Sequence, residues 1–149
     1  MKKYLKYLLL SVFLSANASF ALTPAELEFA VRELSEQVKG KNGFMEFYVG
    51  EVQMFMVMDP NSNRMRIISP ITDYKNLSQE QISAIMQSNF HRALDARYAV
   101  SNGVLYSAFI HPMAELTVQQ LLSAIYQVAN LSLTFGEDYS SGVFDFNGF

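Results

Sequence analysis

The fold is decided by the run Glu51-Val52-Gln53-Met54-Phe55-Met56-Val57-Met58. Successive side chains of a strand point to opposite faces, so Met54, Met56 and Met58 share one face and Phe55 and Val57 share the other. A strand that is apolar on both faces is typical of the middle of a sheet covered on both sides. One face can meet the chain's own helices. The other face then needs more of this chain, a second copy or a client protein, and which face is free stays open.

Strands are predicted on both sides of this run. The segment 44–49 precedes it across Gly50-Glu51, a two-residue connection that suits a tight hairpin. The segment 65–69 follows the turn-forming residues 59–63 and ends at Pro70, because proline cannot donate a hydrogen bond to a neighbouring strand. We therefore expect an antiparallel meander of three strands.

Three capping boxes predict the starts of three helices. The first helix is expected over 23–40, with Thr23 as its cap and Gly40 at its exit. The second runs from Ser78 to about residue 94, and the third starts at Thr117 and ends near residue 136. Apolar residues recur at helical spacing in each of the three segments.

An Asn-Gly pair at 102–103 predicts a second hairpin, with strands over 97–100 and 104–110. The expected order is α-β-β-β-α-β-β-α. It indicates an α+β domain with a five-stranded antiparallel sheet and three helices. Residues 22–136 form this single domain, and residues 137–149 form an aromatic C-terminal tail.

The first twenty-one residues have the pattern of a secretory signal peptide. Three lysines occur within the first six residues, an apolar run covers 7–14, and small residues lead to a cleavage position after Ala21. The apolar run is shorter than the ~20 residues of a membrane-spanning helix, which disfavours the alternative of an uncleaved membrane anchor. The chain has no cysteine, so we expect no lipid anchor. These features predict an exported protein of the periplasm.

Charge and cysteine content exclude several classes of function. The full chain has a formal net charge of −3, and the first twenty-one residues contain lysines but no acidic residue, so the remainder is more acidic still. An acidic surface disfavours nucleic acid and anionic membrane surfaces as partners. Without cysteine there is neither a disulfide nor thiol chemistry. The apolar core, or an oligomer, must then provide the stability.

The order of elements over residues 23–136 resembles the class I type III secretion chaperones and the related YbjN-like domains. The resemblance includes the 102–103 hairpin turn followed by the helix capped at Thr117. It implies a non-enzymatic domain, usually a homodimer, whose exposed apolar surface binds segments of other polypeptides or docks regulatory partners. Secretion chaperones of this class are cytosolic, whereas this chain carries an export signal. We therefore expect a periplasmic binding or regulatory variant of the fold.

The methionines of the central strand have two interpretations. Met54, Met56 and Met58, with Met45 and Met65 on neighbouring strands, could form a thioether site for Cu(I). Flexible methionine side chains also fill irregular cores and adapt to varied binding partners. Copper sites generally add His or Cys, and neither is adjacent in the sequence. We therefore favour packing or client contact, and the alternative function is a periplasmic small-ligand or Cu(I)-binding protein that uses the methionine face. We predict neither a metal site nor a cofactor.

No catalytic motif is recognisable. The two histidines, His91 and His111, fall on different predicted elements, and a structural or surface role is expected for both. The chain has no Gly-x-Ser-x-Gly motif and no glycine-rich phosphate loop. We therefore predict that the protein is not an enzyme.

The C-terminal tail is the second apolar segment of interest. Val143, Phe144, Phe146 and Phe149 fall within its last seven residues. The tail is expected to pack on its own sheet, because aromatic burial is strongly stabilising, and the alternative is an extended segment that pairs with the sheet edge of another copy or a partner.

The segment 82–90 of the second helix is a candidate dimer contact. For partner binding we select seven residues: Met54, Phe55, Met56, Met58, Phe144, Phe146 and Phe149.

Overall fold

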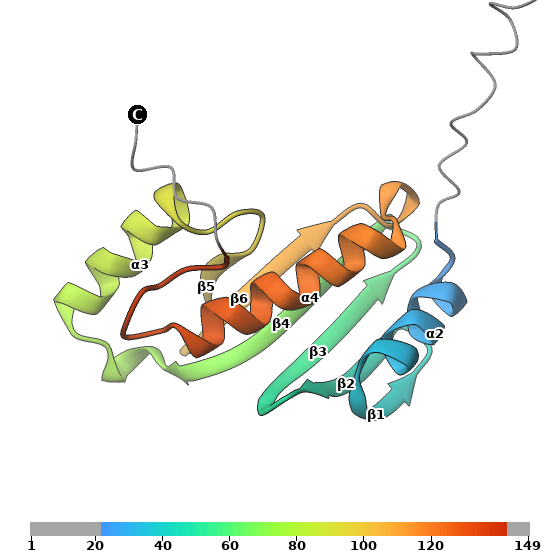
Figure 1. The fold of residues 1–149 in the computed structure, drawn as a ribbon, viewed down its shortest axis with the longest axis horizontal. Coiled ribbons are helices and arrows are strands. Elements are labelled where there is room, and N and C mark those ends of the chain that lie inside the picture. The colour runs from blue at the N-terminus through green and yellow to red at the C-terminus, as the bar shows by residue number, and fades with distance from the viewer. Residues whose placement is uncertain (1–21, 143–149) are drawn as a thin grey trace, which may run out of the picture.

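The computed structural model describes residues 22–142 (Figure 1). The predicted signal peptide over 1–21 and the tail residues 143–149 lie outside the described residues. The longer elements, in chain order, are α2 (Pro24–Leu34), β1 (Glu36–Lys41), β2 (Phe44–Val49), β3 (Val52–Asp59), β4 (Arg64–Asp73), α3 (Gln79–His91), β5 (Arg97–Ser101), β6 (Val104–His111) and α4 (Val118–Leu133). Short 3₁₀ turns at Tyr74–Asn76 and Met113–Glu115 precede α3 and α4.

The strands form one antiparallel sheet in the order β1-β2-β3-β4-β6-β5. The run that decided the fold is β3, which pairs with β2 on one side and β4 on the other. The α+β class and the three helices are confirmed. The predicted number of strands is wrong, because the described sheet has six strands and the order is α-β-β-β-β-α-β-β-α.

The additional strand is β1, which the sequence pattern assigned to the first helix. That helix ends at Leu34, and Ser35 already has an extended backbone. Val38 continues the helical spacing but lies in β1, where pairing with β2 satisfies the backbone groups of this segment. Gly40 is not a helix exit; at φ 92° it lets β1 approach β2 so closely that a Cβ atom would lie 2.3 Å from the Phe44 carbonyl oxygen.

Other boundaries also differ from the expectation. β4 does not end at Pro70 but continues to Asp73, and its pairing with β6 shifts register between Pro70 and Thr72. An irregularity of this kind accommodates a proline within a strand. The helix α3 ends at His91, before the predicted end near residue 94, and α4 ends at Leu133, before the predicted end near residue 136. The last backbone hydrogen bonds of these helices are donated by the cap residues Arg92 and Thr134. All three predicted capping boxes are confirmed.

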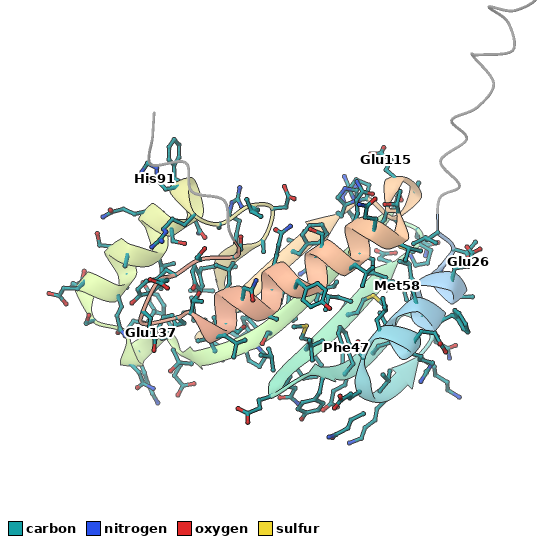
Figure 2. The ribbon with its side chains drawn as sticks, viewed as in Figure 1. Glu26, Phe47, Met58, His91, Glu115 and Glu137 are labelled. Carbon is teal, nitrogen blue, oxygen red and sulfur yellow. The ribbon has the colours of Figure 1, made fainter. Side chains whose placement is uncertain are left out.

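One face of the sheet is covered by helices and forms the core. The long helix α4 lies over β4 and β6 and runs roughly along the strands in Figure 1, with α2 beside β1 at one end of the sheet and α3 beside β5 at the other. Phe47 and Met58 point into the layer between sheet and helices in Figure 2. The core cluster on this inner face unites side chains from β2, β3, β4 and β6 with Leu27 and Val31 of α2 and Leu121 of α4. Burial of this apolar surface is the main stabilising contribution to the domain.

Tyr98 links the edge strand β5 to the end of α4. Its side chain is 5% exposed, and its hydroxyl donates a 2.8 Å hydrogen bond to the Leu131 carbonyl oxygen. Burial raises the pKa of the Tyr98 phenol above its ordinary value, because the charged form would lose its hydration. The hydroxyl therefore stays protonated and keeps this contact at alkaline pH as well as in the neutral range.

Candidate protein-binding surfaces

The face of the sheet opposite the helices is apolar and lacks a covering helix within residues 22–142. We call it the outer sheet face and define it by seven residues: Phe44, Tyr48, Phe55, Val57, Ile68, Tyr106 and Ile110. Phe44 is 50% exposed and Ile110 is 59% exposed, while the other five side chains are half-buried against one another. Exposed apolar patches of this kind on soluble domains commonly mark interaction surfaces.

The strand register places these side chains in rows across the sheet. Val57, Arg66 and Ile110 stand side by side on β3, β4 and β6. Phe55 lies between Glu46 of β2 and Ile68 of β4 in the next row. Charged groups are thus interleaved with the apolar ones on this face.

Two contacts fix the β2–β3 side of this face. The rings of Phe44 and Phe55 have centroids 6.0 Å apart and are tilted by 33°. Gln53 donates a 2.8 Å hydrogen bond from Nε2 to Oε1 of Glu46. These two contacts hold the side chains of Phe44, Phe55, Glu46 and Gln53 against their neighbours across the β2–β3 pair.

The methionines selected for partner binding lie on the opposite, inner face. Met54 and Met56 are 0% exposed, and Met58 is 7% exposed. All three are buried beneath the helices and are unavailable to a partner while the domain is folded, so the free face of β3 is that of Phe55. The three predicted contacts from the tail, Phe144, Phe146 and Phe149, lie outside the described residues.

The same burial bears on the Cu(I) interpretation. Met45 and Met65 join the β3 methionines in the apolar core, at 0% and 1% exposure. A buried core explains the methionines by packing alone, because flexible thioether chains fill irregular space. Within residues 22–142, no group of three His, Cys, Asp or Glu side chains is placed to hold a metal ion.

A second apolar surface lies where α3 meets the edge strand β5. Met86 is 66% exposed, Val100 is 49% exposed and Tyr74 is 42% exposed. Together with Ile82 and Ile85 they line a small groove of about 190 Å³, which we call the α3 groove. The helical pattern over 82–90 had indicated this contact, but the contributions of Tyr74 and Val100 depend on how α3 packs against β5.

The two histidines line separate pockets. His91 lies at the end of α3, beside Ser88 and Tyr139. His111 lies at the end of β6, where its ring stacks on Phe109 at 5.7 Å and its Nδ1 is 2.7 Å from the Pro112 carbonyl oxygen. The structure therefore keeps the histidines apart, as their positions in the sequence indicated. No helix of residues 22–142 is long and apolar enough to cross a membrane.

Comparison with known proteins supports the fold through structure rather than sequence. No family model matches the chain, and no curated protein matches it. Solved structures, in contrast, do match the chain. The chain shares the fold of type III secretion chaperones.

Three structures illustrate the likeness. A chain of the HopA1–SchA chaperone–effector complex matches with a TM-score of 0.57 and 12% identity, covering 73% of this chain and 88% of that one. The Yersinia pestis type III secretion chaperone SycH, in complex with a stable fragment of YscM2, matches with a TM-score of 0.58 and 15% identity, covering 76% and 98%. A chain of the ExsC–ExsE complex matches with a TM-score of 0.56 and 8% identity, covering 75% and 95%.

Proposed function

We propose that this protein is a non-enzymatic, chaperone-like or adaptor domain of the periplasm that binds a client polypeptide through its outer sheet face. The observation that carries the proposal is the uncovered apolar face of a domain whose opposite face is fully packed. The structural neighbours, which are complexes of chaperone-fold proteins with protein partners, support a protein as the ligand. The signal-peptide pattern of residues 1–21 supports the periplasm as the location.

Site-directed photo-crosslinking in native periplasm tests the binding surface. A photoreactive phenylalanine at Val57 is expected to cross-link to a discrete polypeptide, whereas the same group at Tyr126, which is 60% exposed on α4, is not. Two added substitutions, Phe55→Lys and Ile110→Glu, should reduce the yield by roughly tenfold or more, because each places a charge in the centre of an apolar contact. Both introduced charges face an opposite charge across the strands, Glu46 and Arg66 respectively, so folding should be retained.

The proposal fails if Tyr126 yields the same cross-linked polypeptide as Val57, or if the two substitutions leave the yield unchanged while circular dichroism shows folded protein. Cell fractionation of the full-length chain, with mass spectrometry of its N-terminus, tests the location. A chain that begins at Leu22 in the periplasmic fraction is expected, and an uncleaved chain in the cytoplasmic fraction would refute export.

We further propose that the protein is a homodimer, joined through the α3 groove. Exposed apolar side chains of Met86 and Val100 favour this contact, since each is costly to leave in water. Sedimentation of the wild-type protein should show a dimer, and Met86→Glu should shift it to a monomer because two copies would then bury like charges at one interface. Phe29→Glu, at an equally exposed position of α2, serves as the matched control. A wild-type monomer at micromolar concentration would refute the dimer.

A further inference from the structure

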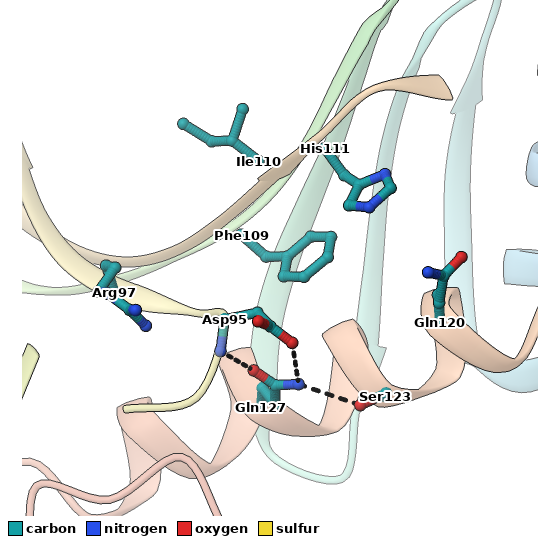
Figure 3. Close-up of a pocket in the computed structure, with 8 residues that line it drawn as sticks. All are labelled: Asp95, Arg97, Phe109, Ile110, His111, Gln120, Ser123 and Gln127. Carbon is teal, nitrogen blue, oxygen red and sulfur yellow. Dashed lines mark hydrogen bonds between the residues drawn. The ribbon is translucent and has the colours of Figure 1, made fainter. Parts of the chain in front are cut away.

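The sheet has an incomplete edge where β5 is shorter than β6. Pairing of β5 with β6 begins at Arg97, opposite Ala108, so Phe109–His111 extend past the end of β5. Beside this extension lies a pocket of about 350 Å³, shown in Figure 3. We call it the edge notch, and it is lined by Asp95, Arg97, Phe109, Ile110, His111, Gln120, Ser123 and Gln127. An unpaired stretch of strand offers backbone donors and acceptors to another extended segment.

The two sides of the edge notch differ in chemistry. On the helix side, Gln120 and Ser123 are exposed polar residues of α4 that face the notch together with His111. On the other side of β6, Ile110 points away from Phe109 and His111, as Figure 3 shows, and is 59% exposed. A strand that fits here must therefore be polar toward α4 and apolar toward the outer sheet face.

The end of the described chain is fixed next to this notch. Ser141 is 1% exposed and is held on two sides: its Oγ accepts a 2.7 Å hydrogen bond from the Leu94 N–H, and its carbonyl oxygen accepts a 3.2 Å bond from Asn130 Nδ2. Leu94 directly precedes Asp95, which lines the notch, and Asn130 lies one helical turn from Gln127. The chain thus leaves the described domain at Gly142, beside Leu94 and close to the Asp95 and Gln127 end of the notch.

The length of the remaining chain matches the notch. Residues 143–149 reach about 23 Å when extended. The distance along α4 from Asn130, where the chain leaves, to Gln120, at the far end of the notch, is about 15 Å at the helical rise per residue. The last seven residues can therefore run the whole length of the notch.

The sequence of these residues also matches the two sides. In Val143-Phe144-Asp145-Phe146-Asn147-Gly148-Phe149, two phenylalanines alternate with two polar residues. In an extended segment Phe144 and Phe146 would lie on one face, and Asp145 and Asn147 on the other. Over residues 144–147 this is the polarity that the notch requires, with phenylalanines toward Ile110 and polar side chains toward Gln120 and Ser123. Val143 and Phe149 share the face of Asp145 and Asn147 and lie at the two ends of the segment.

We propose that residues 143–149 bind in cis in the edge notch, as a strand added along Phe109–His111. In this arrangement the tail completes the edge that β5 leaves open and extends the outer sheet face with Phe144 and Phe146. A strand from a partner or from a second copy could use the same edge, but only after displacing the tail. The proposal does not depend on the proposed function, because it concerns a contact within one chain.

Photo-crosslinking from α4 in the full-length exported chain tests this proposal. A photoreactive phenylalanine at Gln120 is expected to cross-link to a peptide from residues 143–149, and Phe144→Ser/Phe146→Ser should lower that yield roughly tenfold, as expected when aromatic anchors are lost. Val118 is the matched control position, because it lies at the same end of α4 but about 160° around the helix from Gln120, and it is 45% exposed. It should give no tail cross-link.

Two further results discriminate between the possible occupants of the notch. In a mixture of isotopically light and heavy protein, cross-links within one chain support the proposal, whereas cross-links between light and heavy chains overturn it in favour of a second copy. Ending the chain at Gly142 should speed amide hydrogen exchange roughly tenfold at those amides of Phe109–His111 that point away from β4, because the added strand protects these amides. Equal tail cross-linking from Gln120 and Val118, attachment of a foreign polypeptide at Gln120 instead of the tail, or unchanged exchange would each overturn it.

Discussion

Met56→Lys should remove most of the stability of the domain, whereas Phe55→Lys, one residue away on β3, should leave it folded. Met56 is 0% exposed, and its neighbours across the strands are Met45 and Ile67, so a lysine there has no charged or polar partner. Burial lowers the pKa of such a lysine by about 3–5 units. The cost at neutral pH is then about 4–5 kcal/mol, which is comparable with the whole stability of a small domain.

Phe55 differs because its side chain lies on the outer sheet face. Lysine at this position loses the ring contact with Phe44 but stands opposite Glu46, which offsets part of the loss. We expect a net cost of about 1–2 kcal/mol. Urea denaturation followed by circular dichroism measures both variants on the same strand.

The pH dependence gives an independent check on Met56→Lys. The pKa of this lysine is lowered in the folded state, whereas in the unfolded chain it stays at about 10.4. Below about pH 10.4 the unfolded chain therefore binds a proton more readily than the folded protein, and this difference destabilises the folded state. The deficit should therefore shrink as the pH rises from 7 toward 10. Equal stabilities of the Met56 and Phe55 variants, or a deficit that does not change with pH, would contradict the assignment of the two faces.

The contrast between these neighbours shows what the pattern of β3 could and could not predict. Alternation alone separated Met54, Met56 and Met58 from Phe55, because the period of a strand follows from its geometry. It did not decide which set is buried, since both sets are apolar. That depends on where α2 and α4 pack, which is a contact between residues far apart in the sequence. The methionines were therefore chosen as a surface although they form the core.

The missed strand β1 has a comparable cause. Val38 continues the spacing of Leu27 and Val31, so the local pattern favoured a longer helix. The segment is nevertheless a strand, and its backbone pairs with the edge of β2. Local signals with a direct geometric cause, such as the capping boxes and the Asn-Gly hairpin, were predicted correctly. The pairing of β1 at the edge of the sheet was not predicted, because it depends on the position of the neighbouring strand β2.

The same distinction applies to the candidate binding surfaces. The sequence indicated Phe55 and the helix segment 82–90, because each has an apolar pattern of its own. Ile110 and Val100 carry no such signal, and they contribute only because the strand register places Ile110 beside Arg66 and packing places Val100 beside α3. The edge notch could not be predicted either, since it results from a difference in length between two paired strands.

Gln127→Met should destabilise the domain by about 2–6 kcal/mol, although the two side chains are similar in size. Gln127 is 4% exposed, and its Oε1 accepts hydrogen bonds from the backbone N–H groups of Asp95 at 2.8 Å and Ala96 at 3.0 Å. Methionine leaves both donors without an acceptor near the sheet, and each such loss costs about 1–3 kcal/mol. Ser123→Ala is the matched control, because it removes a single contact, the 3.0 Å bond from Gln127 Nε2, at an exposed position.

Gln127→Met should loosen the segment around Asp95 and Ala96 as well as lower the stability of the whole domain. The two hydrogen bonds hold the segment that leads from α3 into β5, and they therefore determine where β5 begins and how much of β6 is left unpaired. Hydrogen exchange should show the amides of Asp95 and Ala96 losing protection first, before the global unfolding that urea denaturation measures. If Gln127→Met costs no more than Ser123→Ala, the segment is held by the packing of Ala96 instead, and the edge notch does not owe its shape to α4.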